Sequence, residues 1–193
     1  MIPIVPPEEA EKRGAAAGVP SPLMTVNAFR VLINNPNVAG AAGRLLAALL
    51  FGGSLDYRLR ELIILRNGWL SASEYEFCQH VSVARRLNIK DEVILGVRDP
   101  DKCTSYNYLD RAVIRMTDQL MTGTDVDPET WATLEKSFSA PQLIELVMVA
   151  GYWPLFAVFL KAAKVQLDDG VASWPEGIKP PAAARGQRFR KES

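Results

Sequence analysis

SLDYRLRELIILR, residues 54–66, and SEYEFCQH, residues 73–80, are the two stretches that decide the fold of this chain. Their apolar spacing predicts two helices, residues 56–70 and 73–87, with a short break between them. The second helix carries His80, the only histidine of the chain. Glu76 precedes it by four residues, which places both side chains on one helical face, close enough to touch. Ser73 lies three residues further back on that face.

Four side chains of these two helices are candidates for proton transfer at neutral pH. The imidazole of His80 has the carboxylates of Glu61 and Glu76 and the phenol of Tyr75 as sequence neighbours. Histidine titrates near neutrality, and carboxylates and phenols are common partners in general acid–base catalysis.

Structural roles for the same residues remain open. A lone histidine can hydrogen-bond a neighbour inside a core without any catalytic role. Glu76 stands at the capping-box position of a helix that Ser73 would begin. Glu61 needs a partner in so apolar a helix, which can be the histidine or a flanking arginine, Arg60 or Arg66.

The remaining periodicity predicts further helices and no strand, so the expected fold class is all-α. The expected helices are residues 38–51, 92–97, 107–122, 128–138, 140–150 and 153–167, with a short helix or extended segment at 24–32. Residues 1–21 are expected to form an extended or loosely helical N-terminal arm. Residues 171–193 are expected to form a C-terminal tail that ends in a basic run.

The charge balance argues against nucleic acid as a partner. Lys and Arg number 22, as do Asp and Glu, so the net charge is zero. Such a chain must cover its apolar surface to stay soluble, which favours a homo-oligomer. The most apolar run, residues 143–160, is long enough to raise the question of a membrane span. Glu145, Gly151 and Pro154 within it favour two buried helices or one kinked helix, so no membrane contact is expected.

The N-terminus and the cysteines favour the cytoplasm. The N-terminal residues lack the apolar core of a signal peptide. The two cysteines, Cys78 and Cys103, make neither a disulfide framework nor a zinc site, so no metal is expected. Cys78 lies two residues before His80, about 200° around the helix, and should face away from Glu76 and His80. Cys103 lies in a polar loop.

A family resemblance joins these features. The two opening stretches, with FSAPQLIEL at residues 138–146 and GYW at 151–153, resemble the carboxymuconolactone decarboxylase family. That family shares a superfamily with the alkyl hydroperoxidase D-like (AhpD-like) proteins. The resemblance covers residues 36–167. It implies an AhpD-like helical bundle in residues 22–170, assembly into dimers, trimers or hexamers, and a pocket near the helix at residues 73–87.

The resemblance also implies which residues act. In the thiol branch of the superfamily a Cys-x-x-Cys motif precedes the histidine, and its two cysteine positions are Ser73 and Glu76 in this chain. A glutamate of that branch corresponds to Glu61. The resemblance therefore implies that Glu61, Glu76 and His80 form a proton relay. It implies no redox thiols, because neither cysteine position of the motif holds a cysteine in this chain.

We therefore expect cofactor-free acid–base catalysis by a decarboxylase-like carbon–carbon lyase, or a related isomerase, on a small organic acid or lactone. The expected catalytic residues are His80, Glu76 and Glu61, and the expected substrate-binding residues are Tyr75, Ser73 and Arg85. An AhpD-like peroxidase and a non-catalytic structural oligomer are the alternatives.

Overall fold

The computed structural model describes residues 2–175, 177 and 178. Across these residues it confirms the all-α prediction, with ten α-helices, one short 3₁₀-helix and no strand. The helices are α1 (Pro7–Ala17), α2 (Ser21–Met24), α3 (Asn27–Leu32), α4 (Pro36–Phe51), α5 (Tyr57–Leu70), α6 (Glu74–Arg86), α7 (Asp91–Gly96), η1 (Pro100–Lys102), α8 (Tyr108–Thr122), α9 (Pro128–Ser137) and α10 (Ala140–Ala163).

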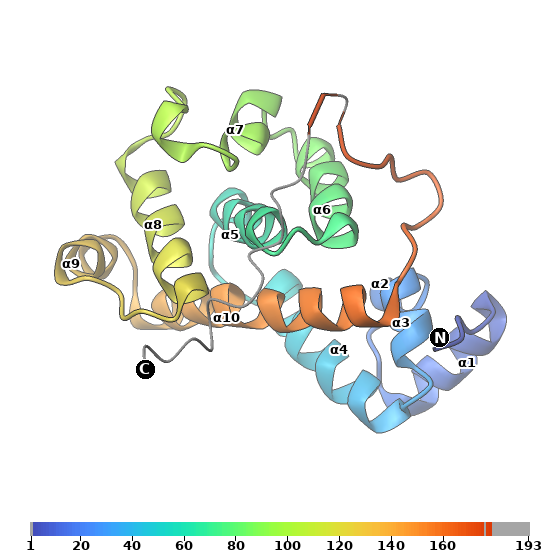
Figure 1. Cartoon of the computed structure of the whole chain (residues 1–193). Coiled ribbons are helices and arrows are strands. Elements are labelled where there is room, and N and C mark those ends of the chain that lie inside the picture. The colour runs from blue at the N-terminus through green and yellow to red at the C-terminus, as the bar shows by residue number, and fades with distance from the viewer. Residues whose placement is uncertain (1, 176, 179–193) are drawn as a thin grey trace, which may run out of the picture.

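Helix α5 lies at the centre of the bundle, with α6, α8 and α10 packed around it (Figure 1). Its residues 62–65 are at most 1% exposed, because a helix with neighbours on all sides buries apolar side chains all round. Asp56 caps its N-terminus by accepting hydrogen bonds from the backbone N–H groups of Arg58 and Leu59. The carboxylate of Glu145, on α10, accepts from the N–H groups of Ser54 and Leu55 and ties the preceding loop to α10.

Helix α10 is one continuous helix of 24 residues, which runs below α5 in Figure 1. The predicted division into two helices, at residues 140–150 and 153–167, is therefore wrong. Pro154 has no N–H to donate to the carbonyl of Ala150, and the side-chain amide of Asn67 on α5 donates to that carbonyl instead, at 3.3 Å. Among the described residues, α10 alone is long and apolar enough to cross a membrane, a test that core helices of soluble proteins also pass.

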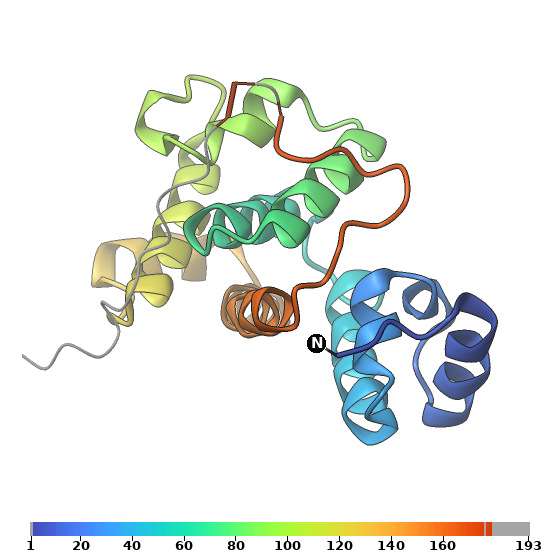
Figure 2. The same cartoon turned by 45° about the vertical axis from the view of Figure 1, so that its right-hand side comes forward.

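The N-terminal segment expected to be extended or loosely helical contains a regular helix, α1, packed against α4. Gly40 allows this close approach, since a Cβ atom there would lie 2.1 Å from the carbonyl oxygen of Ala17. Only Ala10 and Gly14 are buried on α1, so its contact surface consists of small residues that give little apolar signal. Helices α1–α4 form a group on one side of α10, away from α8 and α9 (Figures 1 and 2).

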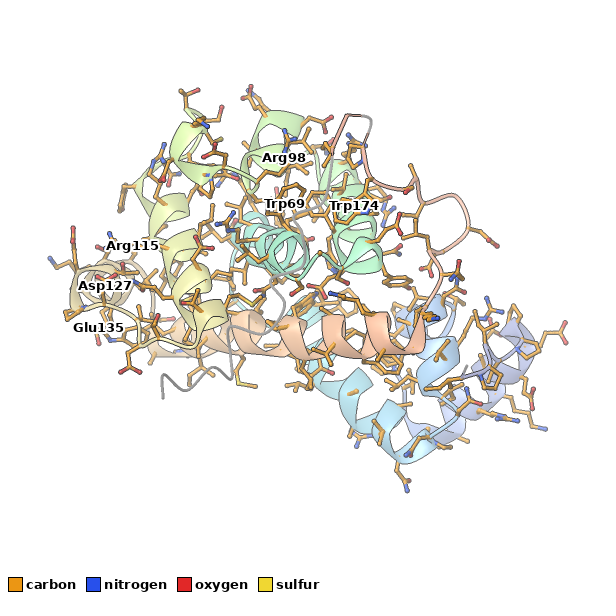
Figure 3. The ribbon with its side chains drawn as sticks, viewed as in Figure 1. Trp69, Arg98, Arg115, Asp127, Glu135 and Trp174 are labelled. Carbon is orange, nitrogen blue, oxygen red and sulfur yellow. The ribbon has the colours of Figure 1, made fainter. Side chains whose placement is uncertain are left out.

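The chain leaves α10 at Lys164, whose φ of 53° is left-handed, before the predicted end at residue 167. It then returns past α6 (Figure 2). Trp174 stacks on Phe77 with ring centroids 5.0 Å apart and meets Trp69 edge-on at 6.0 Å, and Figure 3 shows the two tryptophans together. The basic end of the predicted tail lies outside the described residues.

Candidate active site

A cavity of about 540 Å³ lies where α5, α6 and α10 meet the N-terminal helices α2–α4. Most of its walls are apolar, with Leu23, Val26, Phe29, Leu46, Leu50, Phe156 and Leu160 among them. Helices α5 and α6 contribute the charged and titratable side chains Arg60, Glu61, Tyr75, Glu76, His80 and Arg86, together with Gln79. A mostly apolar space with a few convergent polar groups is the usual form of a small-molecule site.

Close packing of α5 on α6 brings the histidine to a carboxylate. A Cβ atom at Gly68 would lie 2.9 Å from the backbone nitrogen of Phe77, so only glycine fits at this crossing. Along the same pair of helices, Nδ1 of His80 lies 2.7 Å from Oε2 of Glu61. Glu61 and His80, two of the residues that the family resemblance implied as a relay, are therefore in contact.

Two of the three partners considered for Glu61 lie beside it. In addition to His80, the Nε of Arg60 is 3.5 Å from Glu61 Oε1. Arg66 points elsewhere and pairs with Asp118, with Nε and Oδ1 2.6 Å apart. Glu61 is fully buried, so these neighbours provide the compensation that a buried carboxylate needs.

Trp153 determines which nitrogen of His80 carries the proton. Its indole Nε1, which can only donate, lies 3.3 Å from His80 Nε2. That nitrogen must therefore accept, and Nδ1 carries the proton that it donates to Glu61. Trp153 comes from α10, 73 residues away from His80. No local pattern in the sequence links it to the histidine, so its role in the site could not be predicted.

Glu76 does not make the contacts that its sequence position suggested. Neither of its carboxyl oxygens has a hydrogen-bond partner, and the buried Ser73 hydroxyl has none either, so the expected capping box is absent. The predicted contact between Glu76 and His80 is also not a hydrogen bond. Glu76 is 2% exposed and lines the cavity, and its burial raises its pKa well above the usual value. Burial therefore favours the neutral form of this carboxyl over the carboxylate.

Tyr75 and Gln79 are both tied to Asp168, in the segment after α10. The Tyr75 oxygen accepts from the backbone N–H of Ala28 at 3.2 Å, so its own proton goes to Asp168 Oδ1, 2.8 Å away. The hydroxyl proton of Tyr75 is therefore not directed at a substrate, contrary to its expected role. The amide of Gln79 donates to Asp168 Oδ2 at 2.9 Å. Gln79 had a usable sequence signal, since it lies three residues after Glu76 and shares its face.

Ser73 and Arg85, the other two expected substrate-binding residues, do not line the cavity. Ser73 is fully buried at the start of α6. Arg85 is exposed and pairs with Asp91, with Nη2 and Oδ2 2.8 Å apart. Its neighbour Arg86, also exposed, lines the cavity in its place.

The thiol of Cys78 is directed away from the cavity, as the helical spacing predicted. It is 3% exposed, packs in the main hydrophobic core and is not a lining residue. Burial, and secondarily the charge of Glu74, raises the pKa of this thiol to about 12. Cys78 and Cys103 are both free. Across residues 2–175, 177 and 178, no three His, Cys, Asp or Glu side chains are grouped as metal ligands.

Solved structures with the same arrangement of helices identify the fold. An uncharacterised peroxidase-related protein from Silicibacter superposes with a TM-score of 0.73 at 14% identity, over 88% of this chain and 91% of that one. A peroxidase-related protein from Ralstonia eutropha, described as an alkylhydroperoxidase AhpD core, has a TM-score of 0.71 at 17% identity, over 88% and 91% of the two chains.

The chain has the AhpD-like fold. A debrominase in complex with 2,3,4-tribromopyrrole also resembles it, with a TM-score of 0.64 at 15% identity, over 84% of this chain and 85% of that one. No family model matches the sequence. No curated protein matches it either. Because a fold alone does not determine a reaction, the chemistry of this AhpD-like chain depends on the residues of its cavity.

Proposed function

We propose that the cavity is the active site of an enzyme that moves a proton to or from carbon in a small, largely apolar organic acid or lactone, without a cofactor. The observation that carries the proposal is the pair of unlike carboxyl groups in one cavity. Glu61 contacts His80 and Arg60, whereas Glu76 is buried without any partner and its pKa is raised. Titratable groups whose environments differ in this way are typical of acid–base sites.

His80 is the proton carrier in this proposal. Its Nε2 removes a proton from a carbon next to a carbonyl group, and the imidazolium that forms is stabilised through Nδ1–H by the carboxylate of Glu61. The same nitrogen returns the proton to carbon. The indole N–H of Trp153 has to give way first, and its 3.3 Å contact is long enough to be weak.

Glu76 supplies the acid. Its neutral O–H donates a hydrogen bond, or a proton, to the substrate oxygen on which negative charge develops as carbon loses its proton. An uncharged carboxylic acid in an apolar site is well suited to this task, since no desolvated charge has to be held before the reaction.

In a decarboxylation the same groups act, but His80 delivers a proton to carbon and does not remove one. The bond to the carboxyl group breaks, carbon dioxide leaves, and the electron pair becomes an enolate whose oxygen is held by Glu76. His80, protonated at Nε2 by solvent, then gives that proton to the enolate carbon. A positioned acid or base contributes about 10²–10⁴-fold, so delocalisation in the substrate has to lower the remaining barrier.

Two alternatives have less support. A thiol peroxidase needs an accessible thiolate, and Cys78 is buried, lies outside the cavity and has a raised pKa. A purely structural oligomer does not require a cavity of about 540 Å³ that leaves the Glu76 carboxyl without a partner.

The test is carbon-bound hydrogen exchange. The protein is incubated in D₂O with a panel of small organic acids and lactones, and deuterium uptake and carbon dioxide release are followed by NMR. His80→Gln, which cannot titrate near neutrality, should abolish any activity found, and Lys102→Gln, on the exposed η1, serves as the control. A His80→Gln protein with wild-type turnover would refute the proposed mechanism.

A further inference from the structure

The side chain of Asp168 determines how the amide of Gln79 is oriented. Its Oδ1 accepts from the backbone N–H of Asn27 and from the Tyr75 hydroxyl, both at 2.8 Å. Its Oδ2 lies 2.9 Å from Gln79 Nε2. A carboxylate has no proton to donate, so Gln79 must turn its NH₂ group toward Asp168. The carbonyl oxygen of the amide is thereby held in one orientation.

That oxygen is left without a partner. Gln79 lines the cavity, and its Oε1 is buried and accepts no hydrogen bond. Buried polar atoms are normally satisfied, so an orphaned acceptor in a cavity wall points to a donor that arrives with a ligand. The nearby Glu76, 2% exposed, is a second unsatisfied group in the same wall.

Two donors of this wall have no hydrogen-bond partner: the carboxyl of Glu76 and Arg60 Nε, which lies 3.5 Å from Glu61 Oε1. The other donors are in use. The Tyr75 hydroxyl donates to Asp168, the Trp153 indole to His80, and Arg60 Nη1 to the carbonyl of Leu50 at 2.8 Å. The positive charge of Arg60 lies beside Glu61. The remaining cation, Arg86, is exposed. An anionic group at the inner wall would thus find no unmatched positive charge, whereas a neutral donor would find a waiting acceptor.

We infer that the ligand of this cavity is a largely apolar molecule that donates a hydrogen bond from an un-ionised hydroxyl group, and that Gln79 Oε1 accepts it. The surrounding walls are aromatic and aliphatic, which suits a hydroxyl group on an apolar frame, as in a phenol or an enol. The inference rests on the proposed function in taking this cavity as the substrate site. It narrows the substrate class to lactones, and to organic acids that place such a hydroxyl, rather than their carboxylate, against the inner wall.

Asp168 is a positioning residue in this arrangement, since it acts on the ligand only through the amide of Gln79. Loss of that hydrogen bond leaves the amide free to rotate, so either its oxygen or its NH₂ can face the ligand. A site that can present both groups discriminates poorly between a donor and an acceptor, because one hydrogen bond is available to each.

The test compares three naphthalene probes by calorimetric or fluorescence titration of the full chain. They are 2-naphthol, which can donate, 2-methoxynaphthalene, which cannot, and 2-naphthoate, which is anionic. The wild-type protein should bind 2-naphthol about three- to tenfold more tightly than the ether, which corresponds to one net hydrogen bond, and more tightly than the anion. Equal binding of naphthol and ether, tightest binding of naphthoate, or no binding of 2-naphthol would each overturn the inference.

Variants then assign the effect to the amide. Gln79→Met keeps the length of the side chain but removes the acceptor, so the ratio of the two affinities should fall to about one. Gln166→Met, at an exposed glutamine after α10, is the matched control and should keep the wild-type ratio. An unchanged ratio in a folded Gln79→Met would refute the assignment. His80→Gln should keep the wild-type ratio of the naphthol and ether affinities but lose turnover. The binding test and the test of the proposed function can therefore fail independently.

Discussion

Oε2 of Glu61 lies 2.7 Å from Nδ1 of His80, across the crossing of α5 and α6 where Gly68 meets the backbone of Phe77. This contact joins the central helix of the bundle to the wall of the cavity of about 540 Å³. Since the opposite nitrogen of His80 accepts from Trp153, the ring is held from both sides in one tautomer.

The contact predicts that Glu61 and His80 act as a unit. His80→Gln should lower turnover by about 10²–10⁴-fold, and Glu61→Gln by less, because glutamine still accepts from Nδ1 but cannot balance the charge of an imidazolium. The double variant should be little worse than His80→Gln alone, as groups that act together are non-additive. Steady-state rates and thermal melting on all three variants provide the measurement. Additive losses of turnover in the double variant would show that the two residues act independently. A lower melting temperature with unchanged rates would indicate that the pair is only structural.

The cysteines provide a second prediction. Cys78→Ala and Cys103→Ser should each retain turnover, because neither side chain lines the cavity. Cys78→Ala should lower the melting temperature slightly, since it leaves a small void in a well-packed core. Activity assays before and after thiol alkylation check this, with the alkylated wild-type protein as the comparison. Hydroperoxide reduction that disappears in Cys78→Ala would replace the acid–base mechanism with thiol chemistry.

Local sequence patterns were sufficient for much of the fold. The expected helices at residues 56–70, 107–122 and 128–138 correspond to α5, α8 and α9 within about two residues, since apolar periodicity and capping residues act locally. The errors came from tertiary partners. Asn67 satisfies the carbonyl that Pro154 leaves open and so keeps α10 continuous, and Gly40 gives α1 a surface to pack on.

In the site, too, local sequence patterns predicted some features, whereas tertiary contacts determine the others. Glu76 and His80 were identified from their spacing on one helix, and Glu61 was added to them by the family resemblance. The roles of Trp153 and Asp168 could not be predicted, since they contact α6 from 73 and 89 residues away, respectively. The unpartnered state of Glu76 is also a tertiary property. It depends on the cavity, and its sequence position indicated a helix cap instead.

A third prediction concerns self-association through α10. Its exposed residues Ile144, Met148, Gly151, Leu155, Val158 and Ala162 recur at alternating spacings of four and three, the heptad pattern of helices that pack on one another. Ile144, Leu155 and Val158 are 65%, 64% and 67% exposed. An exposed apolar stripe of this kind is usually buried in an interface between chains. We predict that light scattering will find a homo-oligomer, larger than the 21.3 kDa chain.

The double variant Leu155→Lys with Val158→Lys should shift this assembly toward the single chain, because it places charges in the stripe. Tyr108→Lys is the matched control, since Tyr108 on α8 is 71% exposed and lies outside the stripe. A wild-type protein that stays a single chain across a wide dilution range would contradict the prediction. Equal dissociation by Tyr108→Lys would show that α10 is not the interface.

The last prediction uses the raised pKa of Glu76 to separate stability from catalysis. Below about pH 4.5, its usual value, this carboxyl is protonated in both the folded and the unfolded chain and contributes nothing to pH dependence. Above that pH the unfolded chain ionises while the folded protein stays protonated, so the unfolded state binds fewer protons. The free energy of unfolding should therefore decrease as pH rises, by up to about 1.4 kcal/mol per pH unit, until the folded pKa is reached.

Glu76→Gln removes this titration, keeps the shape of the side chain and retains a hydrogen-bond donor. Its stability relative to the wild type should be similar near pH 4.5 and should increase toward pH 7.5, as measured by urea unfolding at several pH values. The same variant should have a lower turnover, since an amide can donate a hydrogen bond but cannot deliver a proton. Glu11→Gln, at an exposed position of α1, should show no pH-dependent difference. A Glu76→Gln protein that is less stable at pH 7.5 would indicate a carboxylate with a hidden partner. A Glu76→Gln protein that is more stable at pH 7.5 and fully active would show that Glu76 only lines the cavity. His80 would then act without it.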